Sequence, residues 1–137
     1  MKTKILSLTI FLIFAVAMFT GCISDKSYGN KLPPNFPSSV PLIEGTIEES
    51  RDAKFEDGKG YIIGIRTPLS YEEAIEFYKK AFETSGDTAK FAEAKNMSGT
   101  SQKVMSVEVY QGEMLILMEI ISGEDSSFVN IAVHLRK

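Results

Sequence analysis

The sequence contains one cysteine, one histidine and no tryptophan among its 137 residues. A single cysteine, Cys22, cannot form an internal disulfide, so the folded part must be stabilised by burial of apolar side chains. Cys22 and His134 are too few for a zinc site, which needs three or four nitrogen or sulfur ligands. The spaced acidic loop typical of calcium sites is also missing. We therefore expect no metal and no cofactor.

Positive charge is scarce as well. The chain has 15 Lys and Arg against 18 Asp and Glu, which gives a formal net charge of −3. Removal of Lys2 and Lys4 with an export segment would lower this charge by 2, to −5. Nucleic-acid binding requires clustered Lys and Arg, which the sequence lacks. We therefore expect no nucleic-acid partner.

The sequence motifs of the common enzyme classes are absent. There is no G-x-S-x-G, no H-E-x-x-H, no phosphate-binding loop and no dinucleotide fingerprint. The serines fall in expected turns and in a tether, and His134 is the only imidazole that could serve as a base. We therefore predict a protein that is not an enzyme.

Proline is confined almost entirely to one stretch. Four of the five prolines are Pro33, Pro34, Pro37 and Pro41. Proline removes a backbone donor and excludes helices and central strands, so we predict a Pro-rich tether over residues 22–41. Its polar first part, residues 24–31, is expected to be flexible. Its second part is expected to lie extended along the domain, with Phe36 and Leu42 buried.

A basic start and an uncharged apolar run open the chain. Lys2 and Lys4 precede residues 5–20, which carry no charge, and the first acid is Asp25. The lysines would stay on the cytoplasmic side while the apolar run enters the bilayer. Small residues after the run give a peptidase access to the backbone. We therefore predict an export signal over residues 1–21.

The end of this run carries a recognisable motif. Phe19-Thr20-Gly21-Cys22 resembles the prokaryotic lipobox, in which an aliphatic residue, a small residue and Gly or Ala precede the cysteine. Phe19 stands where Leu is usual. The resemblance implies that the Cys22 thiol receives a diacylglyceryl group and that cleavage leaves Cys22 as the amino terminus. Two acyl chains, at about 0.8 kcal/mol per buried methylene, would anchor the protein on the extracytoplasmic face of the cell membrane.

Two alternative interpretations of this segment stay open. The uncharged run over residues 5–24 is 20 residues long, which is enough for an uncleaved helix to span a membrane. The signal could also be cleaved without lipidation. The position of the only cysteine favours the lipoprotein.

One amphipathic helix is predicted from Tyr71 to Ser85. Ser70 and Glu73 have the spacing of a capping box, Leu69 can pack on Ala74 as a hydrophobic staple, and a glycine at 86 ends the helix. Apolar residues recur at helical spacing along one face. They are Tyr71, Ala74, Ile75, Tyr78, Ala81 and Phe82.

The apolar period changes to two on both sides of this helix, which predicts strands. Residues 88–94 are expected to add one more strand. The alternating apolar residues are Tyr61, Ile63 and Ile65; Met105, Val107 and Val109; Met114, Ile116, Met118 and Ile120; and Val129, Ile131, Val133 and Leu135.

Two hairpins are predicted among these strands. A two-residue loop within residues 110–113 would pair Val109 with Met114. A three-residue loop at Asp57-Gly58 would pair Phe55 with Tyr61. A two-residue loop there would put Asp52 and Lys54 on the core face, which argues for three.

The predicted fold is α+β and two-layered, with one antiparallel sheet, a single helix packed on one face and the order ββα(β)βββ. Residues 42–137 would form this single domain.

The opening of the domain carries a second resemblance. Residues 33–42 read P-x-x-F-P-x-x-V-P-L and resemble the start of small uncharacterised prokaryotic lipoprotein domains. In those domains a glycine (here Gly45), a strand pair and a helix with an F-Y-K-x-A pattern (here residues 77–81) follow. The match covers about residues 33–86. It implies the architecture and no particular activity.

The sheet face opposite the helix contains the candidate ligand surface. The predicted register places Glu108, Leu115 and His134 in one row across three strands, with Tyr110 and Leu117 as neighbours. Glu108 and His134 would lie about 10 Å apart, or two strand spacings, which is too far for a hydrogen bond. A solvated mixed face is therefore the simplest interpretation of this row.

Apolar residues also point away from the helix on this face. They are Ile62, Leu115, Leu117, Ile121 and Phe128. We expect the Pro-rich segment to cover part of them. If it does not, they form a patch that could bind a protein or an apolar ligand.

These observations lead to one functional hypothesis and two alternatives. The leading hypothesis is a membrane-anchored extracytoplasmic lipoprotein that acts as a non-enzymatic binding or interaction module. The alternatives are a small hydrolase-like extracytoplasmic enzyme and a structural component of the cell envelope.

Overall fold

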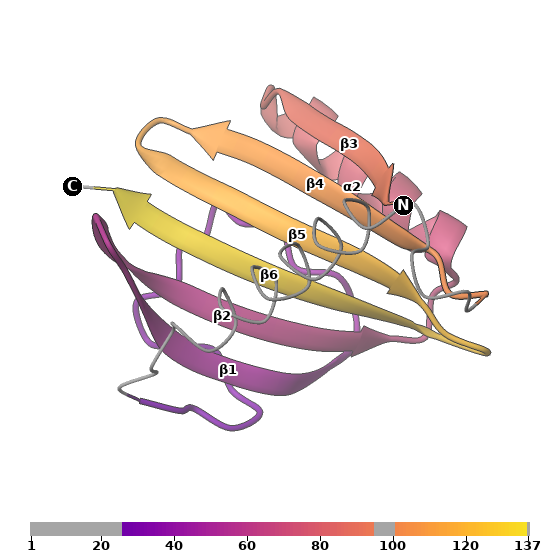
Figure 1. The fold of residues 1–137 in the computed structure, drawn as a ribbon, viewed down its shortest axis with the longest axis horizontal. Helices are drawn as coiled ribbons and strands as arrows, with labels where there is room; N and C mark the ends of the chain where they lie inside the picture. The colour runs from indigo at the N-terminus through magenta and orange to yellow at the C-terminus, as the bar shows by residue number, and fades with distance from the viewer. Residues whose placement is uncertain (1–25, 95–100, 137) are drawn as a thin grey trace, which may run out of the picture.

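The computed structural model describes residues 26–94 and 101–136, so Cys22 and the export segment lie outside it. Six antiparallel strands and one helix make up the fold of these described residues (Figure 1). The elements are β1 (Thr46–Phe55), β2 (Gly58–Thr67), α2 (Tyr71–Ser85), β3 (Ala89–Ala94), β4 (Val104–Gln111), β5 (Met114–Ser122) and β6 (Ser127–Arg136). The strands lie side by side in the order β1-β2-β6-β5-β4-β3. This is the predicted two-layer α+β fold, including the additional strand β3.

Helix α2 begins and ends where its sequence predicts. The Ser70 side chain accepts a hydrogen bond from the Glu73 N–H, and the Glu73 carboxylate accepts one from the Ser70 N–H. Gly86 is left-handed, with φ of 78°, which glycine adopts without the steric cost that a Cβ would bring. The apolar stripe of α2 is buried against the sheet, where it meets the inward side chains of β4, β5 and β6.

The Pro-rich segment packs on the same face of the sheet as α2. Val40 and Ile43 are buried in one core with Tyr78, whose hydroxyl accepts the Ile43 N–H at 3.3 Å. Phe36 contacts Tyr61 with ring centroids 5.7 Å apart. In Figure 1 this purple segment lies behind the sheet, next to α2. One helix is too narrow to cover six strands, so the segment completes the second layer.

This placement corrects an expectation. The Pro-rich segment was expected to cover apolar residues on the face opposite α2, and that prediction is wrong. Phe36 and Leu42 are half-buried as members of the core, while the fully buried residues of the segment include Val40 and Ile43.

The β4–β5 hairpin has a different register from the predicted one. Val109 pairs with Ile116, and the two loop residues are Gly112 and Glu113. Gly112 has φ of 61°, so the glycine occupies the first loop position, where a left-handed conformation suits a type II′ turn. The predicted pairing of Val109 with Met114 is wrong by two residues. A shift of two keeps every side chain on its predicted face.

The β1–β2 hairpin also differs from the prediction. Phe55 pairs with Gly58 across a two-residue loop, and Asp52 pairs with Tyr61 on the helix side. The predicted three-residue loop, which paired Phe55 with Tyr61, is therefore wrong. β1 is an edge strand, so Asp52 can lie at the border of the core and accept a hydrogen bond from the Tyr28 hydroxyl at 3.0 Å.

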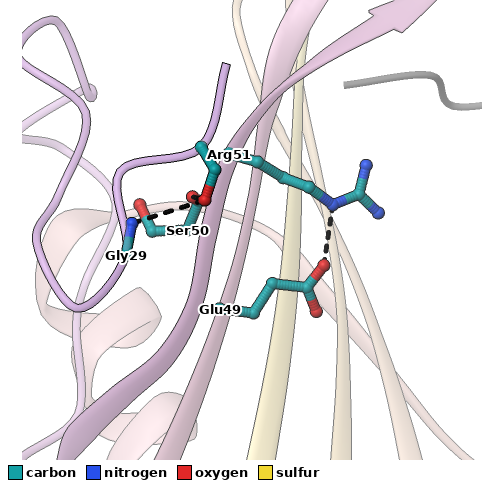
Figure 2. A network of polar contacts seen from close by, with 5 residues as sticks. Gly29, Glu49, Ser50 and Arg51 are labelled. Carbon is teal, nitrogen blue, oxygen red and sulfur yellow. Dashed lines mark hydrogen bonds and ion pairs between the residues drawn. The ribbon is translucent and has the colours of Figure 1, made fainter. Parts of the chain in front are cut away.

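Residues 26–28 pair with the outer edge of β1. The Tyr28 N–H donates to the Ser50 carbonyl at 2.8 Å, and the Asp52 N–H donates to the Lys26 carbonyl at 2.9 Å. Ser27 and Arg51 form the antiparallel bridge between them. Figure 2 shows Gly29 beside Ser50 at this edge. These residues were expected in a flexible tether, and they are instead hydrogen-bonded to the sheet.

Candidate binding face of the sheet

The sheet face that points away from α2 and the Pro-rich segment is called the open face here. Cross-strand pairing places residues of five strands on it. They include Ile62, Ala132, His134, Leu115, Leu117, Glu108 and Tyr110. Tyr110 is 47% exposed and Leu117 is 44% exposed, whereas Ile62 and Leu115 are buried between their neighbours. The open face therefore presents one aromatic and one aliphatic side chain to solvent.

The structure brings the five predicted surface residues together, with one change in their arrangement. His134 pairs with Leu115 as predicted, and Leu115 pairs with Tyr110. Glu108 pairs with Leu117 instead of Leu115, because the β4–β5 register is shifted. The row across the strands is thus His134, Leu115 and Tyr110, and the predicted row containing Glu108 is wrong.

His134 has partners that the sequence analysis missed. Its ring stacks on Phe55, with centroids 4.4 Å apart, and its Nε2 lies 2.8 Å from Asp57 Oδ1. This separation suits an ion pair when the imidazole is protonated, but the Nε2 makes no hydrogen bond. The side chain of His134 is 12% exposed, so the ring is mostly covered.

Glycines in β2 make room for the aromatic rings of the open face. A Cβ at Gly64 would lie 2.7 Å from the Phe128 ring, and a Cβ at Gly60 would lie 2.8 Å from the Phe55 ring. Both rings therefore lie across the glycines of the neighbouring strand. The alternation of Gly58, Gly60 and Gly64 was the sequence signal for these rings.

Two arginines of the open face, Arg51 and Arg136, have partners. Arg51 and Glu49 form an ion pair with Nε and Oε1 2.7 Å apart, which Figure 2 shows next to the β1 edge. The Arg136 guanidinium lies 5.6 Å from the centroid of the Tyr110 ring. Cation–π contact of this kind orders an exposed aromatic side chain.

Glu108 and His134 are too far apart to act as an acid–base pair. Glu108 lies two strands from His134 and two residues out of its row, which places their backbones about 12 Å apart. That separation excludes a direct hydrogen bond. The arrangement is suited to contact with another surface through Tyr110 and Leu117.

Two cavities lie at opposite ends of the sheet. The larger, of about 420 Å³, is at the start of α2 and is lined by Tyr71, Glu72, Lys103 and Asp125, among others. Burial, followed by the charges of Glu93 and Glu72, raises the pKa of Tyr71. A hydrogen bond from its own backbone and one from Lys103 lower the pKa of Glu72.

The smaller cavity, of about 130 Å³, lies at the β1–β2 turn and is lined by residues that include Lys54 and Lys59. Tyr110 and Leu117 line neither cavity.

Two features are absent from residues 26–94 and 101–136. No group of three or more His, Cys, Asp or Glu side chains is placed to hold a metal ion in these ranges. No helix in the same ranges is long and apolar enough to cross a membrane. The apolar run over residues 5–24 lies outside them.

Comparison of the chain with protein-family models, with curated proteins and with solved structures gave no match in any of the three.

Proposed function

We propose that this protein is a lipoprotein anchored through Cys22 to the extracytoplasmic face of the cell membrane, and that its domain binds a protein partner through the open face. It acts as a non-enzymatic interaction module. The observation that carries the binding role is the exposure of Tyr110 and Leu117 on a sheet face that no second layer from residues 26–94 and 101–136 covers.

The proposed location at the membrane is supported by the order of features at the amino terminus. Lys2 and Lys4, the uncharged run and Phe19-Thr20-Gly21-Cys22 follow one another as in exported lipoproteins. The Lys26 carbonyl accepts the Asp52 N–H, and Lys26 follows Cys22 by four positions, so the described body and the anchor are adjacent in the chain.

A protein partner fits the open face better than a small molecule does. Pockets for small ligands are concave and enclose most of the ligand, whereas Tyr110 and Leu117 line neither of the two cavities described above among residues 26–94 and 101–136. Exposed tyrosine and leucine surrounded by charged residues such as Glu108 and Glu119 form an apolar centre with a polar rim, which is typical of protein interfaces.

The anchor is tested by the intact mass of the protein extracted from membranes. The expected mass lacks residues 1–21 and carries two acyl chains on Cys22. Cys22→Ser removes the only thiol in the chain, so the variant should be exported without lipid and without cleavage by the lipoprotein peptidase. Its folding stability should stay within about 0.5 kcal/mol of wild type, because residue 22 precedes the packed body. A wild-type mass equal to the unmodified full chain would reject the lipid anchor.

The binding face is tested by photo-crosslinking from residue 117 in intact cells, followed by binding measurements with the purified partner. Leu117→Glu should weaken the affinity about 30-fold, the effect of about 2 kcal/mol at a central apolar contact. Tyr110→Ala should act in the same direction.

Leu32→Glu is the matched control, because Leu32 is another exposed large apolar residue, 37% exposed, in the Pro-rich segment. A partner that binds wild type and Leu117→Glu equally, or that crosslinks equally from residue 32, would count against the open face. Crosslinking to lipid alone would favour an apolar ligand instead.

A further inference from the structure

The chain enters the domain at a defined point. Residues 26–28 are hydrogen-bonded to β1 through Lys26, Tyr28, Ser50 and Asp52, and the Tyr28 hydroxyl also donates to Asp52. Burial and this hydrogen bond raise the pKa of Tyr28. The entry point is thus tied to the edge of the sheet by backbone and side-chain contacts.

The anchor cannot lie far from this point. Three residues, 23–25, separate Cys22 from Lys26. Four steps along even a fully extended chain span about 14 Å. If Cys22 carries the lipid, as proposed above, Lys26 is held within that distance of the membrane surface.

The direction of entry selects one end of the sheet. Residues 26–28 run antiparallel to β1, with Tyr28 beside Ser50 and Lys26 beside Asp52, so Lys26 is the member of this stretch nearest the Phe55 end of β1. Phe55, Gly58 and Arg136 pair across this end, and the Glu113 carbonyl accepts the Arg136 N–H. We call it the turn end. The opposite end, which holds the start of α2 and the β5–β6 turn, lies about 33 Å away along ten-residue strands.

The two ends differ in charge. Around the turn end, basic and acidic residues are mixed: Lys26, Lys54, Lys59 and Arg136 with Asp52, Glu56, Asp57 and Glu113. At the opposite end the larger cavity is lined by four acids, Glu72, Glu73, Glu124 and Asp125, and by one base, Lys103. Charges are screened over about 8 Å at physiological salt, so acids 33 Å from a bilayer are not repelled by anionic headgroups.

From these observations we infer that the domain rests with its turn end against the lipid headgroups of the membrane that holds the anchor, and with its acidic end facing away. The inference rests on the proposed anchoring at Cys22. It identifies the headgroup surface as a second contact partner, distinct from the protein bound by the open face. The strands then stand upright on the membrane, and the open face remains accessible from the side.

The orientation can be measured in vesicles of phosphatidylethanolamine and phosphatidylglycerol that contain the full lipidated protein. Lipidation consumes the only native thiol, so an introduced cysteine is the single labelling site. Glu113→Cys places a fluorophore at the turn end, and Asp125→Cys is the matched variant at the acidic end. Both residues are exposed. Headgroup-attached nitroxide should quench the label at 113 several-fold more strongly than the label at 125.

A variant with about 12 Gly and Ser residues inserted before Lys26 provides the control, because such a linker reaches about 20 Å and should abolish the difference. Equal quenching at both positions without the insertion, or stronger quenching at 125, would overturn the orientation. The intact mass separates this result from the anchor itself. A lipidated mass with equal quenching rejects the orientation alone. An unmodified mass rejects the lipid anchor, and because Cys22 then keeps its thiol, the orientation is measured in the Cys22→Ser variant.

Discussion

Gly60→Ala is expected to destabilise the domain by about 3 kcal/mol or more, because the new methyl group has no space. A Cβ at Gly60 would lie 1.8 Å from the Val133 carbonyl oxygen and 2.8 Å from the Phe55 ring. The first neighbour is backbone of β6, so β2 and β6 would have to separate at the centre of the sheet. Urea unfolding of the purified protein, followed by circular dichroism, measures this loss.

Gly64→Ala is the matched control for this effect. Its Cβ would lie 2.7 Å from the Phe128 ring and 3.3 Å from the Glu49 Cβ, so its nearest neighbour is a side chain. The Phe128 ring is half-buried on the open face and can rotate away, which should limit the cost to about 1 kcal/mol. Equal losses for Gly60→Ala and Gly64→Ala would show that the Val133 carbonyl is not the cause.

Tyr78→Ala is expected to cost about 4 kcal/mol, the usual range for removing a large aromatic ring from a core. Tyr78 is fully buried and packs between Phe77 and Phe82, with ring centroids 4.9 Å and 6.1 Å away. Tyr78→Phe keeps the ring but leaves the Ile43 N–H without its acceptor, which should cost about 1 to 2 kcal/mol. Hydrogen exchange at Ile43 should then increase, since this bond ties the Pro-rich segment to α2.

The same residue predicts a pH dependence. Burial raises the pKa of Tyr78 above its ordinary value, so the unfolded state loses this proton first as the pH rises. The stabilisation is complete below about pH 10, the unfolded pKa, and is lost above it. Unfolding at pH 8 and pH 11 should therefore show a smaller loss for Tyr78→Phe than for wild type. Equal losses would contradict the assignment to Tyr78, although other tyrosines keep some slope in both proteins.

The helix was predictable because its signals are local. Ser70, Glu73 and Gly86 lie within three residues of the ends that they define, and the apolar stripe needs no knowledge of its partner. The strands were predictable for the same reason, because alternation along one segment assigns each side chain to a face.

The hairpin registers were not predictable from the same pattern. Pairing Val109 with Ile116 or with Met114 buries apolar residues equally, since a shift of two residues leaves the faces unchanged. In the β1–β2 hairpin, the loop length depends on whether Asp52 can lie beside the core. The Tyr28 hydroxyl, from a distant segment, stabilises Asp52 in that position. Local alternation contains no information on such a contact.

The sequence predicts which residues form the candidate surface, but it does not predict how these residues contact their neighbours. The five predicted residues share the open face, because their assignment required only the period of two. The stacking of Phe55 on His134 depended on the two-residue loop between β1 and β2, and so it was missed with that loop. The face covered by the Pro-rich segment was not predictable, because it depends on the width of one helix relative to the described six-stranded sheet, which no local pattern contains.

The pairing of residues 26–28 with β1 also limits how copies of the sheet can join. Addition of a strand from another molecule requires an unoccupied edge of backbone donors and acceptors. Ser27 occupies the middle of the β1 edge, and the other edge of the described sheet is β3, which is six residues long and carries Lys90 and Glu93. Within the described residues, β3 is therefore the longest uninterrupted edge, because the contact at Ser50 to Asp52 divides the edge of β1. Association through β3 joins two copies and leaves only the divided β1 edges for further strand addition.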